Sequence, residues 1–397
     1  MKKKWLLRAG IPLFALGLGF FGIYEIKASI PDTIYTPSDE SVDLKRIADY
    51  PMVDLVESVS ASQNGTRTID CYLANTFLLK QIEIKTTDPL WVEASGMPVG
   101  IYMETKGVLV IDTQELEDAS GNRSCPVGQL IQSGDYLQKI NGEELDKKSQ
   151  LISCLETYTG GDLVFTILRD GEVLDIAVEP MLTADGTYKL GLWIRDNSQG
   201  IGTLTYTTED GTFAALGHGI SDVDTGNLLD LKNGKLYKAQ IMDVKKGSAG
   251  NPGELSGIIY YDSTNELGSI KNNEICGIFG DLRDSYRQKQ GAERKIEVAF
   301  KQEMQEGDAS ILCNVGDTVR EYGVTIEKIY WNARDTNKCF ILRVTDPALL
   351  EKTGGIVQGM SGSPVLQNGK LVGAVTHVFV QDATSGYGVF IENMMKK

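Results

Sequence analysis

From Gly191 to the end of the chain, short apolar segments alternate with turn residues, and this pattern constrains the fold more than any other feature. Segments such as "KAQIMDV", "EICGIFGDL", "CFILRVTD" and "KLVGAVTHVFV" have the length and the β-branched or aromatic content of strands. The 43 glycines, against 11 prolines, suit a chain with many tight turns. The sequence therefore predicts a mainly β protein with a barrel or sandwich rather than an α/β fold.

Charge and residue counts argue against two classes of function. A formal charge of −15 disfavours nucleic acid as a partner, because phosphates need a basic face. Two histidines and six scattered cysteines lack metal-ligand spacing, which disfavours a zinc enzyme. We expect no other metal and no organic cofactor. The cysteine spacing leaves disulfide pairing open.

The N-terminus carries a membrane signal. Basic residues at 2–4 precede an uncharged apolar run from Ala9 to Tyr24, and the flanks from Trp5 to Ile26 bring it near the ~20 residues that span a bilayer. The basic residues favour an N-terminus in the cytoplasm. We therefore expect an uncleaved anchor in residues 1–27 and the rest of the chain outside the cytoplasm; a cleavable signal peptide is the alternative. Residues 28–88 are predicted to be a linker followed by strands that join a neighbouring sheet.

Residues 89–183 have a different pattern of elements. A strand, a Thr-Lys-Gly turn and a returning strand are followed by the amphipathic segment "KKSQLISCLETY" and two more strands. This order resembles a PDZ domain, which binds a peptide by β-augmentation. In that resemblance Pro98, Val99, Gly100 and Ile101 form the carboxylate-binding loop, where glycine lets backbone N–H groups converge on an anion. A β-rich spacer is the alternative.

The segment "GMSGSP" places Ser361 between small residues. These residues are also the usual components of a tight turn. The arrangement nevertheless suits a nucleophile, because small neighbours expose the hydroxyl. The N–H groups of Gly359 and Ser361 could converge as an oxyanion hole.

A serine nucleophile needs a base, and the chain offers two histidines. Glycines flank His218 in "ALGHGISD", at the end of an apolar strand. His377 lies within the apolar strand "GAVTHVFV", where a buried core histidine is the plainer interpretation. His218 is therefore the candidate base.

The residue types alone do not identify an acid to orient that base. Several carboxylates are candidates: Asp222, Asp224, Asp243, Asp335 and Asp346. Asp346 directly precedes Pro347, so it also fits a helix N-cap.

These residues carry a family resemblance. "GMSGSP" resembles the Gly-x-Ser-Gly-x-Pro loop of chymotrypsin-like serine proteases, and the blocks "ALGHGISDVDTG" and "RVTDPALLEKTGGIVQGMSGSPVL" resemble the SpoIVB peptidases, the stage IV sporulation protein B family. The resemblance implies a chymotrypsin-like double β-barrel over residues 184–397, preceded by the PDZ domain and the membrane anchor. It also implies a catalytic triad of His218, Asp346 and Ser361, and it places His377 on a strand that lines the substrate pocket.

The resemblance further implies a function. It is that of a self-cleaving serine endopeptidase in sporulation signalling, acting between the two forespore membranes. The enzyme would cleave a membrane-associated regulator, which leads to activation of a late mother-cell sigma factor. The alternative is a non-catalytic PDZ adaptor on a β-barrel scaffold.

Overall fold

The apolar segments of the sequence form strands, and buried residues recur at every second position along them. In β24 (Phe340–Val344) the side chains of Phe340, Leu342 and Val344 are buried, with half-buried residues between them. Period-two burial is what a strand with one core-facing side requires. The computed structural model describes residues 22–24, 26–27, 30, 32–36, 53–58, 66–287, 295–316, 318–331 and 335–395, and the predicted mainly β class is confirmed.

Strand pairing closes a first ring, which we call barrel 1. Its order is β6, β15, β16, β20, β19, β17 and back to β6. Its strands are β6 (Pro98–Thr113), β15 (Leu192–Thr207), β16 (Thr212–Ala215), β17 (Leu231–Lys245), β19 (Glu266–Glu274) and β20 (Gly277–Leu282). The side chains of Leu204, Phe213, Leu236 and Ile278 belong to the core of this ring.

A second ring, barrel 2, is built from the C-terminal part of the chain. Its order is β26, β27, β24, β23, β22, β25 and back to β26. Its other strands are β22 (Gly307–Cys313), β23 (Arg320–Ile329), β25 (Pro364–Gln367), β26 (Lys370–Val378) and β27 (Ser385–Phe390). A separate apolar core fills it, including Phe340, Leu342, Val365 and Val375.

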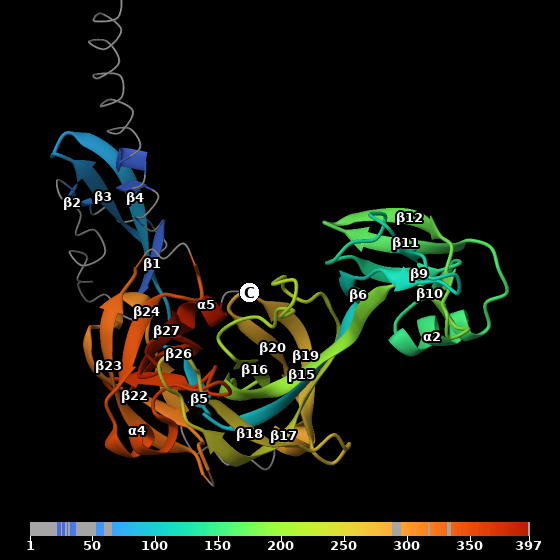
Figure 1. The fold of residues 1–397 in the computed structure, drawn as a ribbon. Coiled ribbons are helices and arrows are strands. Elements are labelled where there is room, and N and C mark those ends of the chain that lie inside the picture. Colours follow the sequence, from blue (N-terminus) through green and yellow to red (C-terminus); the bar gives the residue numbers. More distant parts are fainter. Residues whose placement is uncertain are drawn as a thin grey trace, which may run out of the picture.

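Further elements surround the two barrels (Figure 1). Strand β5 joins the barrels, because it pairs with β15 on one side and with β21 on the other. These elements are β5 (Trp91–Ala94), β18 (Glu254–Ile259), α3 (Asp284–Arg287), β21 (Lys295–Val298), the 3-10 turn Lys301–Glu303, α4 (Pro347–Thr353) and α5 (Ile391–Met395).

A small domain is inserted between the two longest strands of barrel 1. Figure 1 shows β6 and β15 running from the barrel into it. Residues 106–195, which we call the inserted domain, have their own core, which includes Val108, Leu137, Phe165 and Ile167. Its elements are β7 (Leu116–Glu117), β8 (Arg123–Ser124), β9 (Tyr136–Ile140), β10 (Glu143–Glu144), α2 (Lys148–Glu156), β11 (Leu163–Arg169), β12 (Glu172–Val178), β13 (Met181–Leu182) and β14 (Tyr188–Lys189).

This insertion differs from the boundaries expected at residues 89 and 184. Residues 93–94 and 98–105 pair with strands of barrel 1, so the domain with its own core begins later and is inserted within barrel 1 rather than preceding it. The expected Thr-Lys-Gly hairpin is also wrong, because β6 continues through it and Gly107 only adopts a positive φ of 100°. Strand β6 passes from one core into another without turning, so the Thr-Lys-Gly pattern does not mark a hairpin here.

The assignment of Pro98–Ile101 to a carboxylate-binding loop is wrong for the same reason. These residues form the buried start of β6 and pair with both β15 and β17. A Cβ on Gly100 would lie 2.2 Å from Cγ2 of Ile259, so this glycine permits close packing of the barrel rather than anion binding.

The N-terminal strands form a sheet of their own rather than joining a neighbour. Its order is β1 (Thr33–Thr36), β4 (Phe77–Thr86), β3 (Thr66–Leu73) and β2 (Val53–Ser58), around the buried Ile34, Ile69 and Ile82. The expected anchor in residues 1–27 lies mostly outside the described residues. No helix in the described part of the chain is both long and apolar enough to cross a membrane. The six cysteines are free thiols.

Candidate active site

Ser361 lies in a loop of barrel 2 that is fixed to barrel 1. Its carbonyl accepts a hydrogen bond from the N–H of Thr203, at 3.0 Å. The hydroxyl of Thr203 donates to the carbonyl of Gly359, and that of Thr205 donates to the carbonyl of Gly362, each at 2.8 Å. Strand β15 therefore sets the position of the serine loop through three hydrogen bonds.

Two glycines in this loop have backbones that side chains disfavour. Gly359 has a φ of 96° and Gly362 a φ of 95°. A Cβ on Gly362 would lie 2.2 Å from the carbonyl oxygen of Thr203. The spacing of glycines around Ser361 is thus required by the way the loop meets barrel 1.

The N–H groups of Gly359 and Ser361 donate to no acceptor in the described part of the chain. The neighbouring amides of Met360 and Gly362 do bond to backbone carbonyls, at 3.1 and 2.8 Å. Two free donors on either side of one residue are what an oxyanion hole needs.

The hydroxyl of Ser361 points to β26 in this structure. Its Oγ donates to the carbonyl oxygen of Thr376 at 2.8 Å. Among the described residues, no hydrogen bond joins Ser361 to His218. The serine must therefore turn its hydroxyl toward the histidine before it can react, and loose geometry of this kind is common without substrate.

His218 follows β16 in a tight turn that packs against β26. Leu216 and Gly217 both have positive φ values, of 73° and 71°. For a branched, buried residue such as Leu216 this conformation is uncommon and is usually held by its surroundings. A Cβ on Gly217 would lie 2.9 Å from Cγ2 of Thr376, so the turn brings His218 close to the strand that follows Ser361.

The tautomer of His218 follows from its partner. Nδ1 lies 2.8 Å from the carbonyl oxygen of Gly219, and a carbonyl can only accept, so Nδ1 carries the proton. Nε2 is then free to accept a proton, as a general base must. Burial lowers the pKa of His218, and the hydrogen bond to Gly219 partly opposes this effect.

One cavity of about 470 Å³ brings these groups together. Ser361, Gly359, His218 and His377 all line it, and no Asp, Glu, Lys or Arg side chain in the described chain does so. Its remaining walls are mainly apolar, with Ile101, Ile201, Leu216, Ile356 and Val378 among them. We call this the serine cavity.

His377 lies beside His218, with ring centroids 5.0 Å apart and planes 35° apart. Burial lowers the pKa of His377 to about 4, helped by the charge of His218 and of Lys338. Its Nδ1 is buried and has no hydrogen-bond partner among the described residues. His377 is therefore a neutral wall of the serine cavity at neutral pH.

The structure does not bring Asp346 to this cavity. Its Oδ1 accepts from the N–H groups of Ala348 and Leu349, at 2.9 and 3.2 Å, so Asp346 is the N-cap of α4. No hydrogen bond or ion pair joins it to His218 in the described chain, and the position expected for an acid is taken by the carbonyl of Gly219. The helix-cap alternative is the one that the geometry supports.

The other candidate carboxylates do not line the serine cavity either. Asp222 and Asp224 pair with Arg195, and Asp335 lies 3.5 Å from Lys338. Asp243 lies on β17, in the part that pairs with β18. The sequence did not predict the two carbonyl groups that bind the candidate catalytic side chains, those of Gly219 and Thr376. Every residue type has a backbone carbonyl, so no sequence signal marks them.

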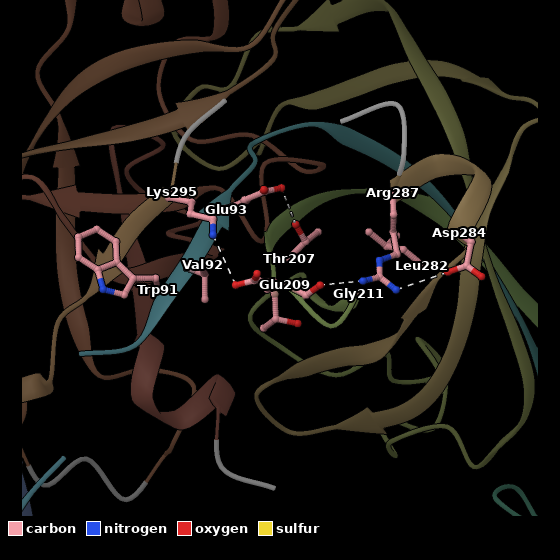
Figure 2. Close-up of a pocket in the computed structure, with 11 residues that line it drawn as sticks. Trp91, Val92, Glu93, Thr207, Glu209, Gly211, Leu282, Asp284, Arg287 and Lys295 are labelled. Atoms are coloured by element: carbon pink, nitrogen blue, oxygen red, sulfur yellow. Dashed lines mark hydrogen bonds and ion pairs between the residues drawn. The ribbon is translucent and has the colours of Figure 1, made fainter. Parts of the chain in front are cut away.

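A second cavity, of about 500 Å³, differs in its chemistry (Figure 2). We call it the charged cavity, and most of its charged groups are paired with one another, whereas Glu93 accepts from the hydroxyl of Thr207. Lys295 pairs with Glu209, and Arg287 binds Asp284 and the carbonyl of Glu209. No cluster of three or more potential metal ligands occurs among the residues that the structure describes.

Comparison with known proteins gives one strong match. A family model for the SpoIVB peptidases, peptidase family S55, matches residues 186–395. No curated protein matches the chain. A solved structure of an HtrA-type protease, an AlgW variant with a decapeptide, is 10% identical, with 76% of this chain and 62% of that chain covered and a TM-score of 0.29. At that TM-score the likeness is too weak to define the fold.

A serine and a histidine at one cavity, beside two free backbone donors, are groups that a serine protease requires. The chain belongs to the SpoIVB peptidase S55 family, because the family model covers more than half of it.

Proposed function

We propose that this protein is a serine endopeptidase on a chymotrypsin-like double barrel, with Ser361 as nucleophile and His218 as general base. The observation that carries the proposal is the pair of unbonded N–H groups, of Gly359 and Ser361, beside the serine hydroxyl in the serine cavity. Asp346 has no part in it, because its carboxylate caps α4. The carbonyl of Gly219 orients His218 instead.

The reaction follows from these positions. The Oγ of Ser361 leaves the carbonyl of Thr376 and attacks the substrate carbonyl carbon while its proton passes to Nε2 of His218. The N–H groups of Gly359 and Ser361 hold the oxyanion. The C–N bond then breaks and the leaving amine takes the proton from Nε2. Water, activated by His218, hydrolyses the acyl-enzyme and restores the hydroxyl of Ser361.

The lining of the serine cavity supports a preference for apolar substrate side chains. Ile356 and Val378 form part of its wall, and His377 adds a neutral ring. A charged side chain would lose its hydration there without finding an opposite charge. We propose that His377 helps to read the substrate side chain.

The biological setting rests on the family and on the N-terminal sequence. We propose an enzyme of sporulation signalling that is anchored by residues 1–27, with its barrels outside the cytoplasm in the forespore intermembrane space. Its substrates would be its own N-terminal region and a membrane-associated regulator whose cleavage leads to sigma-factor activation. The inserted domain is proposed to be the PDZ-like module. Family membership and the basic residues before the apolar run support this setting.

The test uses the full chain and a fluorophosphonate probe, followed by peptide mapping. Ser361 should be labelled in the wild type, and Ser361→Ala should show neither labelling nor self-cleavage. Gly369→Ala, in the turn between β25 and β26, does not line the cavity and should retain labelling. If the wild type is not labelled and neither protein cleaves itself, a non-catalytic binding protein becomes the better interpretation.

A further inference from the structure

The segment that follows His218 forms a hairpin held by one amide side chain. The N–H of Ile220 donates to Oδ1 of Asn273 at 2.8 Å. Nδ2 of Asn273 donates to the carbonyls of Ile220 and Leu229, at 2.8 and 2.9 Å. The base of this hairpin includes Gly219, whose carbonyl orients the ring of His218. The position of His218, the proposed general base, therefore depends on the hairpin.

A buried carboxylate shapes the tip of the hairpin. The side chain of Asp222 has no exposed surface, and its Oδ1 accepts from the N–H groups of Asp224 and Thr225, at 3.0 and 2.9 Å. Its Oδ2 is paired with the guanidinium of Arg195. The same guanidinium reaches Oδ2 of Asp224 at 3.1 Å. A buried carboxylate without a charged partner would be strongly unfavourable, so Arg195 is needed to hold this turn.

Arg195 is not part of the hairpin. It lies where β15 passes from the inserted domain into barrel 1. Arg195 pairs with Leu109 in the inserted domain, and the register of β15 against β6 shifts before Asn197, which pairs with Glu104 in the barrel. The residue that neutralises Asp222 thus sits on the junction between two separately packed cores.

Three further contacts join the rest of this segment to the inserted domain. The N–H of Asp230 donates to the hydroxyl of Tyr136 at 3.1 Å, and its carbonyl accepts from the N–H of Lys106 at 3.0 Å. Lys232 forms an ion pair with Asp146 at 2.5 Å. Residues 219–233 are therefore attached to the inserted domain at several points along their length.

We propose that Arg195 is a positioning residue for His218: it bridges the inserted domain to the buried Asp222, so that the placement of the inserted domain sets the placement of the catalytic base. The proposal rests on the proposed function for the role of His218. Without Arg195, the turn at Asp222 loses its counter-charge and the hairpin loosens. A small displacement of a base can reduce the rate of reaction by a large factor.

A second pair of the same kind provides a matched control. Arg169 binds Asp135 through two hydrogen bonds, at 2.7 and 2.6 Å. The side chain of Asp135 is 1% exposed and that of Arg169 is 25% exposed, against 0% for Asp222 and 35% for Arg195. Arg169 binds only Asp135 and the carbonyl of Leu130 and no residue of the hairpin, so Arg169→Ala should leave the contact between Arg195 and Asp222 in place.

The experiment compares Arg195→Ala, Arg195→Lys and Arg169→Ala in the full chain. The rate of fluorophosphonate labelling at Ser361 should fall about 10- to 100-fold in Arg195→Ala and stay within about twofold of wild type in Arg169→Ala. Arg195→Lys should be intermediate, because a single ammonium cannot bridge both carboxylates as the guanidinium fork does. Equal rates in Arg195→Ala and Arg169→Ala would overturn the proposal while leaving the peptidase assignment intact.

Amide hydrogen exchange tests the position of the hairpin without relying on catalytic activity. In Arg195→Ala, or in Arg195→Lys if the first variant does not fold, the amides of residues 220–228 should exchange faster than in wild type. In Arg169→Ala the faster exchange should instead fall near residues 130–136. Unchanged exchange of residues 220–228 in the Arg195 variant would also overturn the proposal. If Ser361 of the wild type is not labelled at all, the proposed function itself is contradicted.

Discussion

The serine cavity and the charged cavity are similar in volume, at about 470 and 500 Å³, but differ in how their polar groups are used. In the charged cavity, Lys295, Glu209 and Arg287 bind one another or nearby backbone (Figure 2). In the serine cavity, the N–H groups of Gly359 and Ser361 have no acceptor in the described chain. Backbone donors without a protein acceptor that face a cavity can bind a ligand there. The serine cavity is therefore identified as the candidate active site by its unbonded donors, and not by its volume or its charge.

The largest effect should come from removing the base in the serine cavity. We expect His218→Gln to lower the labelling rate at Ser361 by roughly 10⁴-fold or more, because nucleophile and base act as a unit. Labelling kinetics with the full chain measure it. A loss of less than tenfold would mean that another group accepts the proton.

The next effect should come from the oxyanion donors. At Gly359, alanine would be strained by the φ of 96° and would bring its Cβ within 3.0 Å of Cβ of Leu255. Turning this peptide away should lower the rate of peptide cleavage by about 10²–10³-fold. The control is Gly369→Ala, which has a φ of 77° but no neighbour within 4 Å, and which should reduce only stability. Equal losses of activity in both variants would contradict the role of Gly359.

The pH dependence tests the state of His218. Because burial lowers its pKa below the ordinary value of about 6.5, the neutral, active form persists into mildly acidic solution. Labelling of Ser361 should be constant above that value and fall about tenfold per pH unit once pH drops below the lowered pKa. A midpoint above 6.5 in the rate profile would show that a charged partner, such as a carboxylate, supports His218.

Asp346 lies outside both cavities and should have a smaller effect on activity. Asp346→Ala removes the N-cap of α4 and should reduce the free energy of unfolding by about 1 kcal/mol. Asp346→Asn should retain most of that stability, because an amide oxygen can also cap, and labelling should stay within tenfold of wild type. Urea unfolding and labelling measure the two quantities. If Asp346→Asn lost labelling while keeping its stability, Asp346 would be the acid of a triad after all.

The smallest effect should come from the charged cavity. Glu209 is largely exposed, and its ion pair with Lys295 is at the surface. We expect Glu209→Gln to change the free energy of unfolding by less than about 0.5 kcal/mol and to leave labelling unchanged. A loss of activity in this variant would mean that the two cavities are coupled.

Much of the site could be predicted because its signals are local. Glycines around Ser361 and His218 are required by backbone geometry within a few residues, and that requirement is visible in the sequence. The expected SpoIVB family is confirmed by the family model. Asp346 could not be settled in the same way, because Asp before Pro347 fits both a helix cap and a catalytic acid until its hydrogen-bond partners are known.

The sequence by itself determined the strand-rich class, the serine loop and the turn that carries His218, because each depends on period, glycine or short spacing. Only the tertiary structure decided that residues 106–195 are inserted into barrel 1, that Ile101 faces the serine cavity, and that Arg195 reaches Asp222. These facts depend on which distant strands pair with β6 and β15. Strand pairing is set by the fit of whole cores, which local pattern does not encode.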